Sequence, residues 1–372
     1  MKTFRCQKCG QALFFENVEC LNCKSQLAFL PDRMTMAAIE PIQGSDGRWQ
    51  IKARGRRRKA PRQYRLCRNT DHAACNFVVP AEDDNPYCVA CRLTRVLPDL
   101  SKPENHQRWY RIEVAKRRLF YTLAKLGLIS PEPQGGEPDG PVFEFLEDLP
   151  GAPVMTGHSE GLITINVAEA DDDERVRRRV ALHEPYRTLL GHFRHEIGHY
   201  YWDVLIRDGN QVEPFREVFG DESVDYGEAL RRHYEAGGNP ANWQLEHVSA
   251  YATSHPWEDW AETWAHYLHM VDLLETAASY NTRITLPGDD EDELEELVNP
   301  FEQKAPVFEE LVEQWVPITL LVNSLNRSLG QEDAYPFALT AGALRKLRYV
   351  HDVIQANRKA QKVDQGLEQP PA

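Results

Sequence analysis

The stretch GHFRHEIGHYYWDVL, residues 191–205, holds two histidines four positions apart, with a glutamate directly after the first. Apolar residues recur at spacings of three and four over residues 188–206, which predicts a helix. On another face of that helix His195 and His199 lie one turn apart, so both imidazoles can reach one metal ion. Glu196 is rotated by about 100° from His195 and can take a proton from a nearby water without binding the metal. The apolar positions are Leu189, Phe193, Ile197, Tyr200 and Val204.

This division of roles is typical of metal-assisted hydrolysis. The ion lowers the pKa of a water molecule and polarises a carbonyl, while Glu196 acts as general base and then returns the proton to the leaving amine. The alternative is a pair of surface histidines that flank a glutamate by accident. Gly198 costs about 1 kcal/mol relative to alanine inside a helix, so we expect another segment to pass close to it. His192 is a weaker candidate for a ligand, because it lies a turn away from the pair.

A catalytic zinc needs a third protein ligand and one open position. The motif is not extended by a further histidine, because Leu205 stands where that residue would be. The best source of a third ligand is HPWEDWAETWAHYLH, residues 255–269, which is predicted to be a helix beginning at Pro256. This segment places Glu258, Glu262, His266 and His269 on one helical face.

We choose Glu262 as the third ligand, because Ala261 and Ala265 beside it allow a partner helix to approach closely. Glu258 is the alternative ligand. His266 is then expected to orient a ligand rather than to bind the metal. A group that stabilises the developing oxyanion is also needed. The sequence does not choose among the candidates for that role, which are Tyr251, His255, Tyr267 and Tyr335.

All eight cysteines precede residue 92, and their spacing points to metal rather than to disulfides. The first set is two CxxC pairs, and a segment of this size needs a metal to fold. The second set joins one CxxC pair to two more widely spaced cysteines, for which free thiols are the alternative. Closed four-thiolate sites have no open position, so we expect two structural zinc ions beside the catalytic one. The sets are Cys6, Cys9, Cys20 and Cys23, and Cys67, Cys75, Cys88 and Cys91.

Charge is distributed unevenly along the 372 residues. Residues 1–125 carry 24 Lys and Arg against 12 Asp and Glu, whereas the remainder carries 19 against 45. The basic tract of residues 54–59 could contact nucleic acid, but few aromatic residues accompany it and a solvated loop is favoured. The N-terminus MKTFRCQKCG is not that of a signal peptide, and no apolar run could span a membrane. We therefore expect a cytoplasmic protein without membrane contact.

Other segments are predicted from periodicity and composition. Residues 105–128 indicate an amphipathic helix, and the alternation in GLITINV, residues 161–167, indicates a half-buried strand. An acidic stretch at 171–174 is expected to open a helix. Residues 289–296 are interpreted as a solvated acidic run, and about 305–360 as helical.

Four blocks together resemble the bacterial zinc-binding metallopeptidases that carry an N-terminal zinc-ribbon domain. The blocks are CQKCG…CLNCK, YRLCRN…YCVACR, HFRHEIGHYYWD and HPWEDWAETWAHYLH. The resemblance also covers GLITINV and DAYPF, and it implies a gluzincin-like zincin domain. The implied fold is α+β, with a small β-rich zinc-ribbon domain at residues 1–98, a mainly helical peptidase domain with a small sheet at 101–360, and a disordered tail at 361–372. GLITINV would be the edge strand that binds an extended substrate, and residues 207–250 would be an insertion that shapes the cleft.

The leading hypothesis is a zinc metallopeptidase that acts on a peptide or protein. In it His195, His199 and Glu262 hold the zinc, and Glu196 is the general base. One alternative is a zinc-ribbon module that binds nucleic acid or protein and carries a catalytically silent zincin scaffold. Another alternative is a hydrolase of non-peptide amides.

Overall fold

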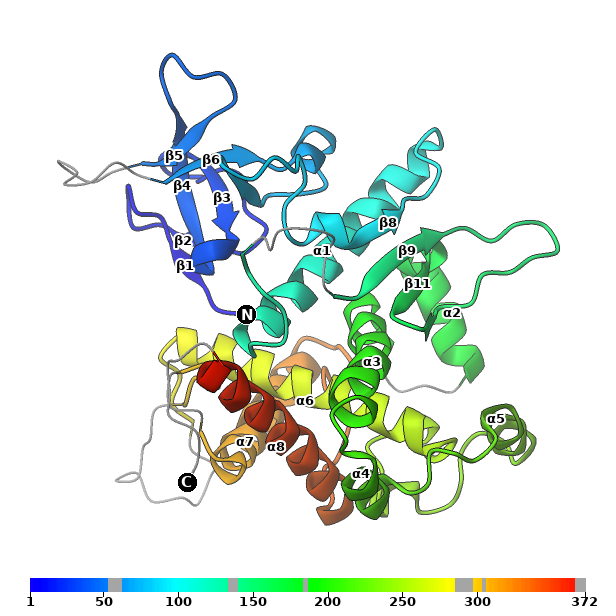
Figure 1. Cartoon of the computed structure of the whole chain (residues 1–372). Helices are drawn as coiled ribbons and strands as arrows, with labels where there is room; N and C mark the ends of the chain where they lie inside the picture. Colours follow the sequence, from blue (N-terminus) through cyan, green and yellow to red (C-terminus); the bar gives the residue numbers. More distant parts are fainter. Residues whose placement is uncertain (53–61, 133–139, 183–186, 285–296, 303–305, 365–372) are drawn as a thin grey trace. The chain divides into compact units, whose positions relative to one another are not determined.

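The computed structural model describes residues 1–52, 62–132, 140–182, 187–284, 297–302 and 306–364. The chain divides into two compact units, residues 1–175 and 176–372 (Figure 1). The sequence-based boundary near residue 100 therefore falls inside the first unit, and it stays a prediction. The basic tract of residues 54–59 and the acidic run of 289–296 lie outside the described residues. Within the described part of the chain, no helix is both long and apolar enough to cross a membrane.

The first unit begins with a short hairpin and a five-stranded antiparallel sheet, and this confirms the β-rich start of the fold. The hairpin pairs β1 (Phe4–Arg5) with β2 (Ala12–Leu13). The sheet has its strands in sequence order. Its core is formed by small and branched residues together with Tyr64. The strands are β3 (Gln26–Leu30), β4 (Thr35–Pro41), β5 (Trp49–Ile51), β6 (Gln63–Leu66) and β7 (Val78–Pro80).

A second, four-stranded mixed sheet completes the first unit together with α1 (Pro103–Lys125). The strand order is β10-β11-β9-β8, in which β9 is parallel to both of its neighbours. The helix and strand predicted at 105–128 and 161–167 are confirmed by α1 and β11. GLITINV is not an edge strand, however, because β11 pairs with β10 on one side and with β9 on the other. The strands are β8 (Thr94–Val96), β9 (Val142–Leu146), β10 (Gly157–Ser159) and β11 (Leu162–Asn166).

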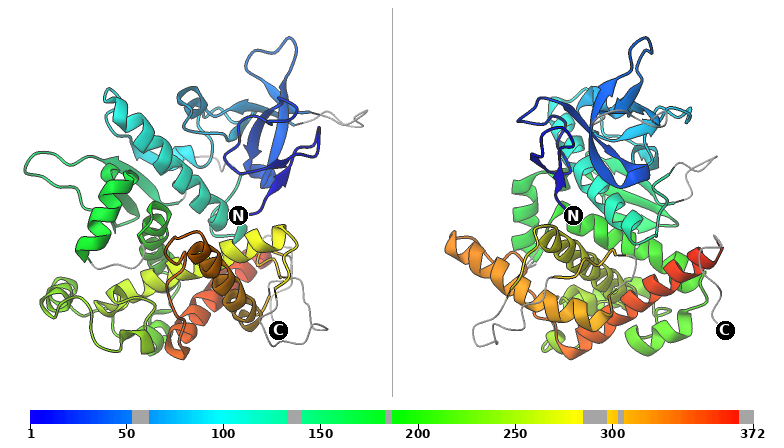
Figure 2. Two further views of the ribbon diagram at one scale, coloured as in Figure 1. Left: turned by 180° about the vertical axis from the view of Figure 1, so that it is seen from behind. Right: turned by 90° about the vertical axis from the view of Figure 1, so that its left-hand side faces the viewer.

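The second unit is helical in its described residues and is built around α6 (Pro256–Ser279). Helices α3 (Leu189–Trp202), α7 (Phe308–Ser328) and α8 (Ala341–Asp364) pack against α6 (Figure 2). The last two confirm the predicted helical C-terminal part. Because α8 extends to Asp364, residues 361–364 are helical rather than part of a disordered tail, and 365–372 lie outside the description. The remaining helices are α2 (Asp172–Leu182), which opens in the acidic stretch as predicted, α4 (Val212–Phe219) and α5 (Tyr226–Glu235).

Helices α3 and α6 approach each other closely at Gly198. A Cβ atom on Gly198 would lie 3.0 Å from Cα of Ala261 and 3.2 Å from Cβ of Trp264. The Gly198 carbonyl also accepts a 2.8 Å hydrogen bond from the indole N–H of Trp260. This confirms the expectation that another segment passes at Gly198. The contact sets the register of α6 along α3 and hence decides which α6 side chains face the two histidines.

Candidate metal centre

Three side-chain atoms of the second unit converge between α3 and α6. The Nε2 atoms of His195 and His199 are 3.2 Å apart. Glu258 Oε2 lies 3.0 Å from the first and 3.5 Å from the second. The two imidazoles come from one helical face, as predicted, whereas the carboxylate comes from the first turn of α6. The three residues form a group that can hold a metal ion.

The spacing of these three atoms fits a tetrahedral zinc. Ligand atoms at about 2.0–2.1 Å from zinc are about 3.3 Å apart along a tetrahedral edge. The observed separations of 3.0, 3.2 and 3.5 Å bracket that value. Glu258 Oε2 is buried and accepts no hydrogen bond of regular geometry from the described residues. A buried carboxylate oxygen in that position is stabilised by a cation.

Glu262, the ligand chosen from sequence, occupies a different position. Its Oε1 accepts a 2.7 Å hydrogen bond from Nδ1 of His195, and its Oε2 accepts a 2.6 Å bond from the Ser249 hydroxyl. When the proton of the neutral imidazole is on Nδ1, the lone pair of Nε2 points into the space shared with Glu258 Oε2 and His199 Nε2. The structure therefore places Glu258, the sequence-based alternative, beside the paired nitrogens. Glu262 instead sets the tautomer and ring orientation of His195.

The electrostatics of the group are those of a cation site. Burial disfavours a charged His195, but the Glu258 and Glu262 carboxylates outweigh burial and raise its pKa well above the usual range. Burial opposes ionisation of Glu258 as well, yet its neighbours His199 and His195 bring its pKa well below the usual range. His195 and Glu258 are thus each stabilised in the charged form by their neighbours. A bound metal ion replaces the imidazole proton as the source of positive charge.

Glu196 is buried on α3 next to His195, with 8% of its surface exposed. Its charge is one of the causes that raise the pKa of Tyr226, so its carboxylate lies near that phenol. The Tyr226 hydroxyl donates a 2.7 Å hydrogen bond to Glu258 Oε1. The Tyr226 phenol therefore contacts the Glu258 carboxylate and also senses the Glu196 charge.

Of the remaining predicted residues, Tyr251 lies beside His195, whereas the Tyr267 hydroxyl lies 3.0 Å from Nδ1 of His351 on α8. The Tyr251 ring lies 6.0 Å from the His195 ring. His266 Nδ1 and the Tyr335 hydroxyl are 2.5 Å apart, and the Glu262 charge acts on His266. Burial lowers the pKa of His266 to about 4. His266 is thus a neutral, buried neighbour of Glu262, and its orienting role stays a prediction. The hydroxyl of Tyr335 faces His266 rather than the paired Nε2 atoms.

Sequence reasoning missed three residues of the site. Trp257 lies against the His199 ring at a centroid distance of 3.8 Å. Ser249 holds Glu262, and Tyr226 holds Glu258. Trp257 could have been found from its place directly before Glu258. Ser249 and Tyr226 lie in the segment between α3 and α6 and are placed only by tertiary structure.

Both cysteine sets come together in the first unit as predicted. Sγ atoms bound to zinc at about 2.3 Å are about 3.8 Å apart along a tetrahedral edge. The observed separations are 3.6 Å for Cys6–Cys23, 3.6 Å for Cys9–Cys20 and 3.8 Å for Cys75–Cys88. Each set of four offers its sulfur atoms within 4.8 Å of one another. The described residues thus hold two four-cysteine groups and one His-His-Glu group, which suggests three zinc sites.

The second four-cysteine group is buried against charged residues of α1. Lys116 and Arg117 are 1% and 2% exposed. Lys116 Nζ donates a 2.9 Å hydrogen bond to Glu113, and Glu113 Oε2 lies 3.9 Å from Cys91 Sγ. Arg117 donates to the carbonyl of Ala74, the residue before Cys75. A four-thiolate zinc would carry two net negative charges and the buried Glu113 adds a third, so Lys116 and Arg117 offset two of the three.

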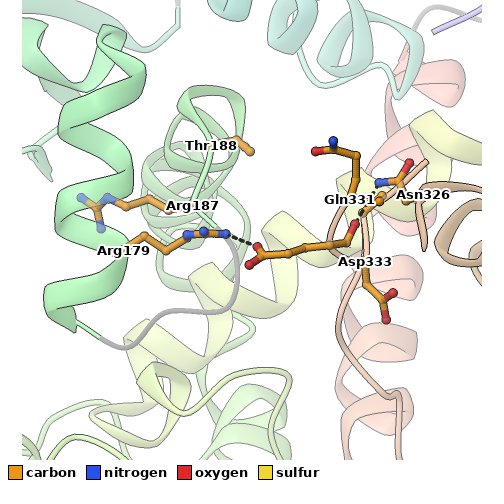
Figure 3. A pocket seen from close by; sticks show the side chains of 9 residues that line it. Arg179, Arg187, Thr188, Asn326, Gln331 and Asp333 are labelled. Atoms are coloured by element: carbon orange, nitrogen blue, oxygen red, sulfur yellow. Dashed lines mark hydrogen bonds and ion pairs between the residues drawn. The ribbon is translucent and has the colours of Figure 1, made fainter. Parts of the chain in front are cut away.

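A separate cavity of about 540 Å³ lies beside the N-terminus of α3 and contains none of the predicted site residues (Figure 3). Arg179 crosses it and donates a 2.7 Å hydrogen bond to Glu332. The lining residues are Arg179, Arg187, Thr188, Asn326, Gly330, Gln331, Glu332, Asp333 and Ala334.

Comparison with known proteins agrees with this organisation. Residues 105–353 match a family model described as "Putative zinc-binding metallo-peptidase", and residues 3–102 match a zinc-ribbon domain. Relatives from Mycobacterium tuberculosis and Mycobacterium bovis, both named as uncharacterized proteins, are 39% identical over 358 residues, which is 95% of this chain and 95% of each relative. No solved structure matches the chain. With its His-His-Glu group and two four-cysteine groups, the chain belongs to the zinc-binding metallopeptidase family, in the form that carries an N-terminal zinc ribbon.

Proposed function

We propose that this protein is a zinc-dependent peptidase that hydrolyses amide bonds of a peptide or protein substrate. The observation that carries the proposal is the convergence of two Nε2 atoms and one carboxylate oxygen, with the buried Glu196 directly beside them in sequence. Three ligands leave a fourth tetrahedral position open, as catalytic rather than structural zinc requires. Among His195, His199, Glu258 and Glu262, the most accessible side chains are those of His195 and Glu262, at 14% and 21% exposed. Substrate is therefore expected to approach from their side.

The roles of the residues follow from their positions. His195, His199 and Glu258 would hold the zinc, which when bound lowers the pKa of a water molecule and polarises the substrate carbonyl. Glu196 takes the proton of that water as it attacks the carbonyl carbon. Glu196 then gives the proton to the amide nitrogen as the C–N bond breaks, so that a carboxylic acid and an amine leave. Glu262 and Ser249 keep the His195 lone pair directed at the metal throughout.

Replacement of Glu196 by glutamine tests this proposal. A glutamine side chain cannot accept the proton but keeps the size of the glutamate, so Glu196→Gln should retain all bound zinc and lose at least about 100-fold in peptide hydrolysis. The measurement is mass spectrometry of a complex peptide mixture incubated with each protein. Glu217→Gln, at an exposed position on α4, is the matched control and should cleave like the wild type. Equal cleavage by wild type and Glu196→Gln would remove the basis of the mechanism.

A further inference from the structure

Tyr226 belongs to the segment inserted between the two ligand-bearing helices, yet it contacts a metal-site residue directly. It is the first residue of α5, and its hydroxyl donates a 2.7 Å hydrogen bond to Glu258 Oε1. The other oxygen of that carboxylate, Oε2, faces the two Nε2 atoms. One carboxylate therefore joins the phenol to the place where a metal would sit.

The position of Tyr226 is set by the first turn of α6. His255 Nδ1 accepts a 3.0 Å hydrogen bond from the backbone N–H of Trp257, so the ring proton is on Nε2. That Nε2–H donates a 3.1 Å bond to the carbonyl of Val224, two residues before Tyr226. The Tyr226 ring lies edge-on to the rings of His255 and Trp257, at 5.3 and 5.9 Å. The inserted segment is thus fastened to α6 at the turn that carries Glu258.

The chemistry of this contact favours a donor role. A phenol is protonated at neutral pH because its ordinary pKa is about 10, so the Tyr226 hydroxyl is the donor to the Glu258 carboxylate. A hydrogen bond from a neutral donor to a carboxylate is among the stronger ones in proteins. Because Oε1 is held by the phenol, rotation of the carboxylate that would turn Oε2 away from the histidines is opposed. Outer partners of this kind typically contribute about 10–100-fold to metal affinity.

We propose that Tyr226 is a positioning residue of the His195–His199–Glu258 centre. It holds Glu258 Oε2 toward the two histidines. The metal affinity of the centre therefore depends on the packing of residues 207–250 against α6. This inference rests on the proposed assignment of the metal ligands. It does not depend on whether the protein cleaves peptides.

The test compares Tyr226→Phe with Tyr234→Phe in the full-length protein. Tyr234 is on the same helix and 53% exposed, and it therefore serves as the matched control. Zinc affinity is measured by competition with a chromogenic chelator, and the site geometry by the visible absorption of the Co²⁺-substituted protein. Tyr226→Phe should bind the third metal at least about 10-fold more weakly and shift the Co²⁺ bands. The two four-cysteine sites and the Tyr234→Phe protein should be unchanged.

The outcomes separate the two proposals. Wild-type affinity and an unchanged Co²⁺ spectrum in Tyr226→Phe would overturn the positioning role and leave the peptidase proposal standing. A weakened third site in Tyr226→Phe, together with absent hydrolysis in the wild type, would support the positioning role and reject the peptidase. Retention of two tightly bound zinc ions reports that the variant is folded in its first unit, and far-ultraviolet circular dichroism reports on the helices of the second.

Discussion

Glu262 accepts a 2.7 Å hydrogen bond from Nδ1 of His195, on the side of the imidazole opposite to the atom that faces Glu258. Glu258 and Glu262 of α6 thus lie at the two nitrogens of one histidine. Only Oε2 of Glu258 also reaches His199, at 3.5 Å. The two carboxylates therefore have different partners although they lie one helical turn apart.

Removal of the two carboxylates should therefore have unequal effects on zinc content. Glu258→Gln takes away a ligand charge and should reduce bound zinc from three equivalents to two. In Glu262→Gln the amide oxygen can still accept the hydrogen bond from Nδ1–H of His195. This variant should keep three zinc equivalents, with the zinc affinity of the third site lowered by about 10–100-fold. Elemental analysis after dialysis against a weak chelator measures both. Loss of zinc in Glu262→Gln alone would show that the sequence-based ligand choice was the correct one.

Gly198→Ala should destabilise the second unit despite the better helix propensity of alanine. The propensity gain is about 1 kcal/mol. The added Cβ, however, would lie 3.0 Å from the Ala261 backbone, which cannot rotate away, and overpacking of this kind costs about 1–3 kcal/mol. Urea unfolding followed by circular dichroism should show a lower midpoint. Gly227→Ala on α5 is the control, since its Cβ would meet only a side-chain oxygen at 3.7 Å and should leave the midpoint equal or higher.

Arg117 and Arg118 are adjacent on α1 and should respond differently to replacement. Arg117 is buried beside the second four-cysteine group, so Arg117→Met leaves negative charge uncompensated and should cost about 3 kcal/mol or more. Zinc release from the second four-cysteine group should also become faster in Arg117→Met. Arg118 pairs with Glu16 at the surface and is 42% exposed, so Arg118→Met should cost about 1 kcal/mol or less. Equal zinc-release rates in the two variants would show that the buried guanidinium does not stabilise the zinc site.

The buried His266 predicts a loss of stability in mild acid. Burial lowers its folded-state pKa to about 4, whereas an unfolded histidine titrates near 6.5. Between those pH values His266 is protonated in the unfolded chain and neutral in the folded chain. Stability is therefore fully present above about pH 6.5 and falls by about 3 kcal/mol as the pH drops toward about 4. In His266→Asn, which keeps a polar partner for Tyr335, this part of the slope should disappear from urea midpoints measured across the range.

The local sequence determined much of this protein. The spacing of His195 and His199 on an amphipathic stretch specifies the helix and its metal-facing side, because helical periodicity is a property of consecutive residues. The cysteine pairs of the first unit are local in the same sense. The strand in GLITINV was likewise predicted from its alternation, whereas its interior place in the sheet depends on partners elsewhere in the chain.

Tertiary structure alone decided which carboxylate faces the histidines. Glu258 and Glu262 share a helical face, and a shift of α6 by one turn, about 5.4 Å, would exchange them. The close contact of Gly198 with Ala261 selects one register, and it brings the first turn of α6 to the paired nitrogens. Tyr226 reaches the same place from the segment between α3 and α6, whose path no periodicity describes. Contacts between segments distant in sequence depend on packing, and that is why the positions of Glu258, Glu262 and Tyr226 around the histidines emerged only from the folded chain.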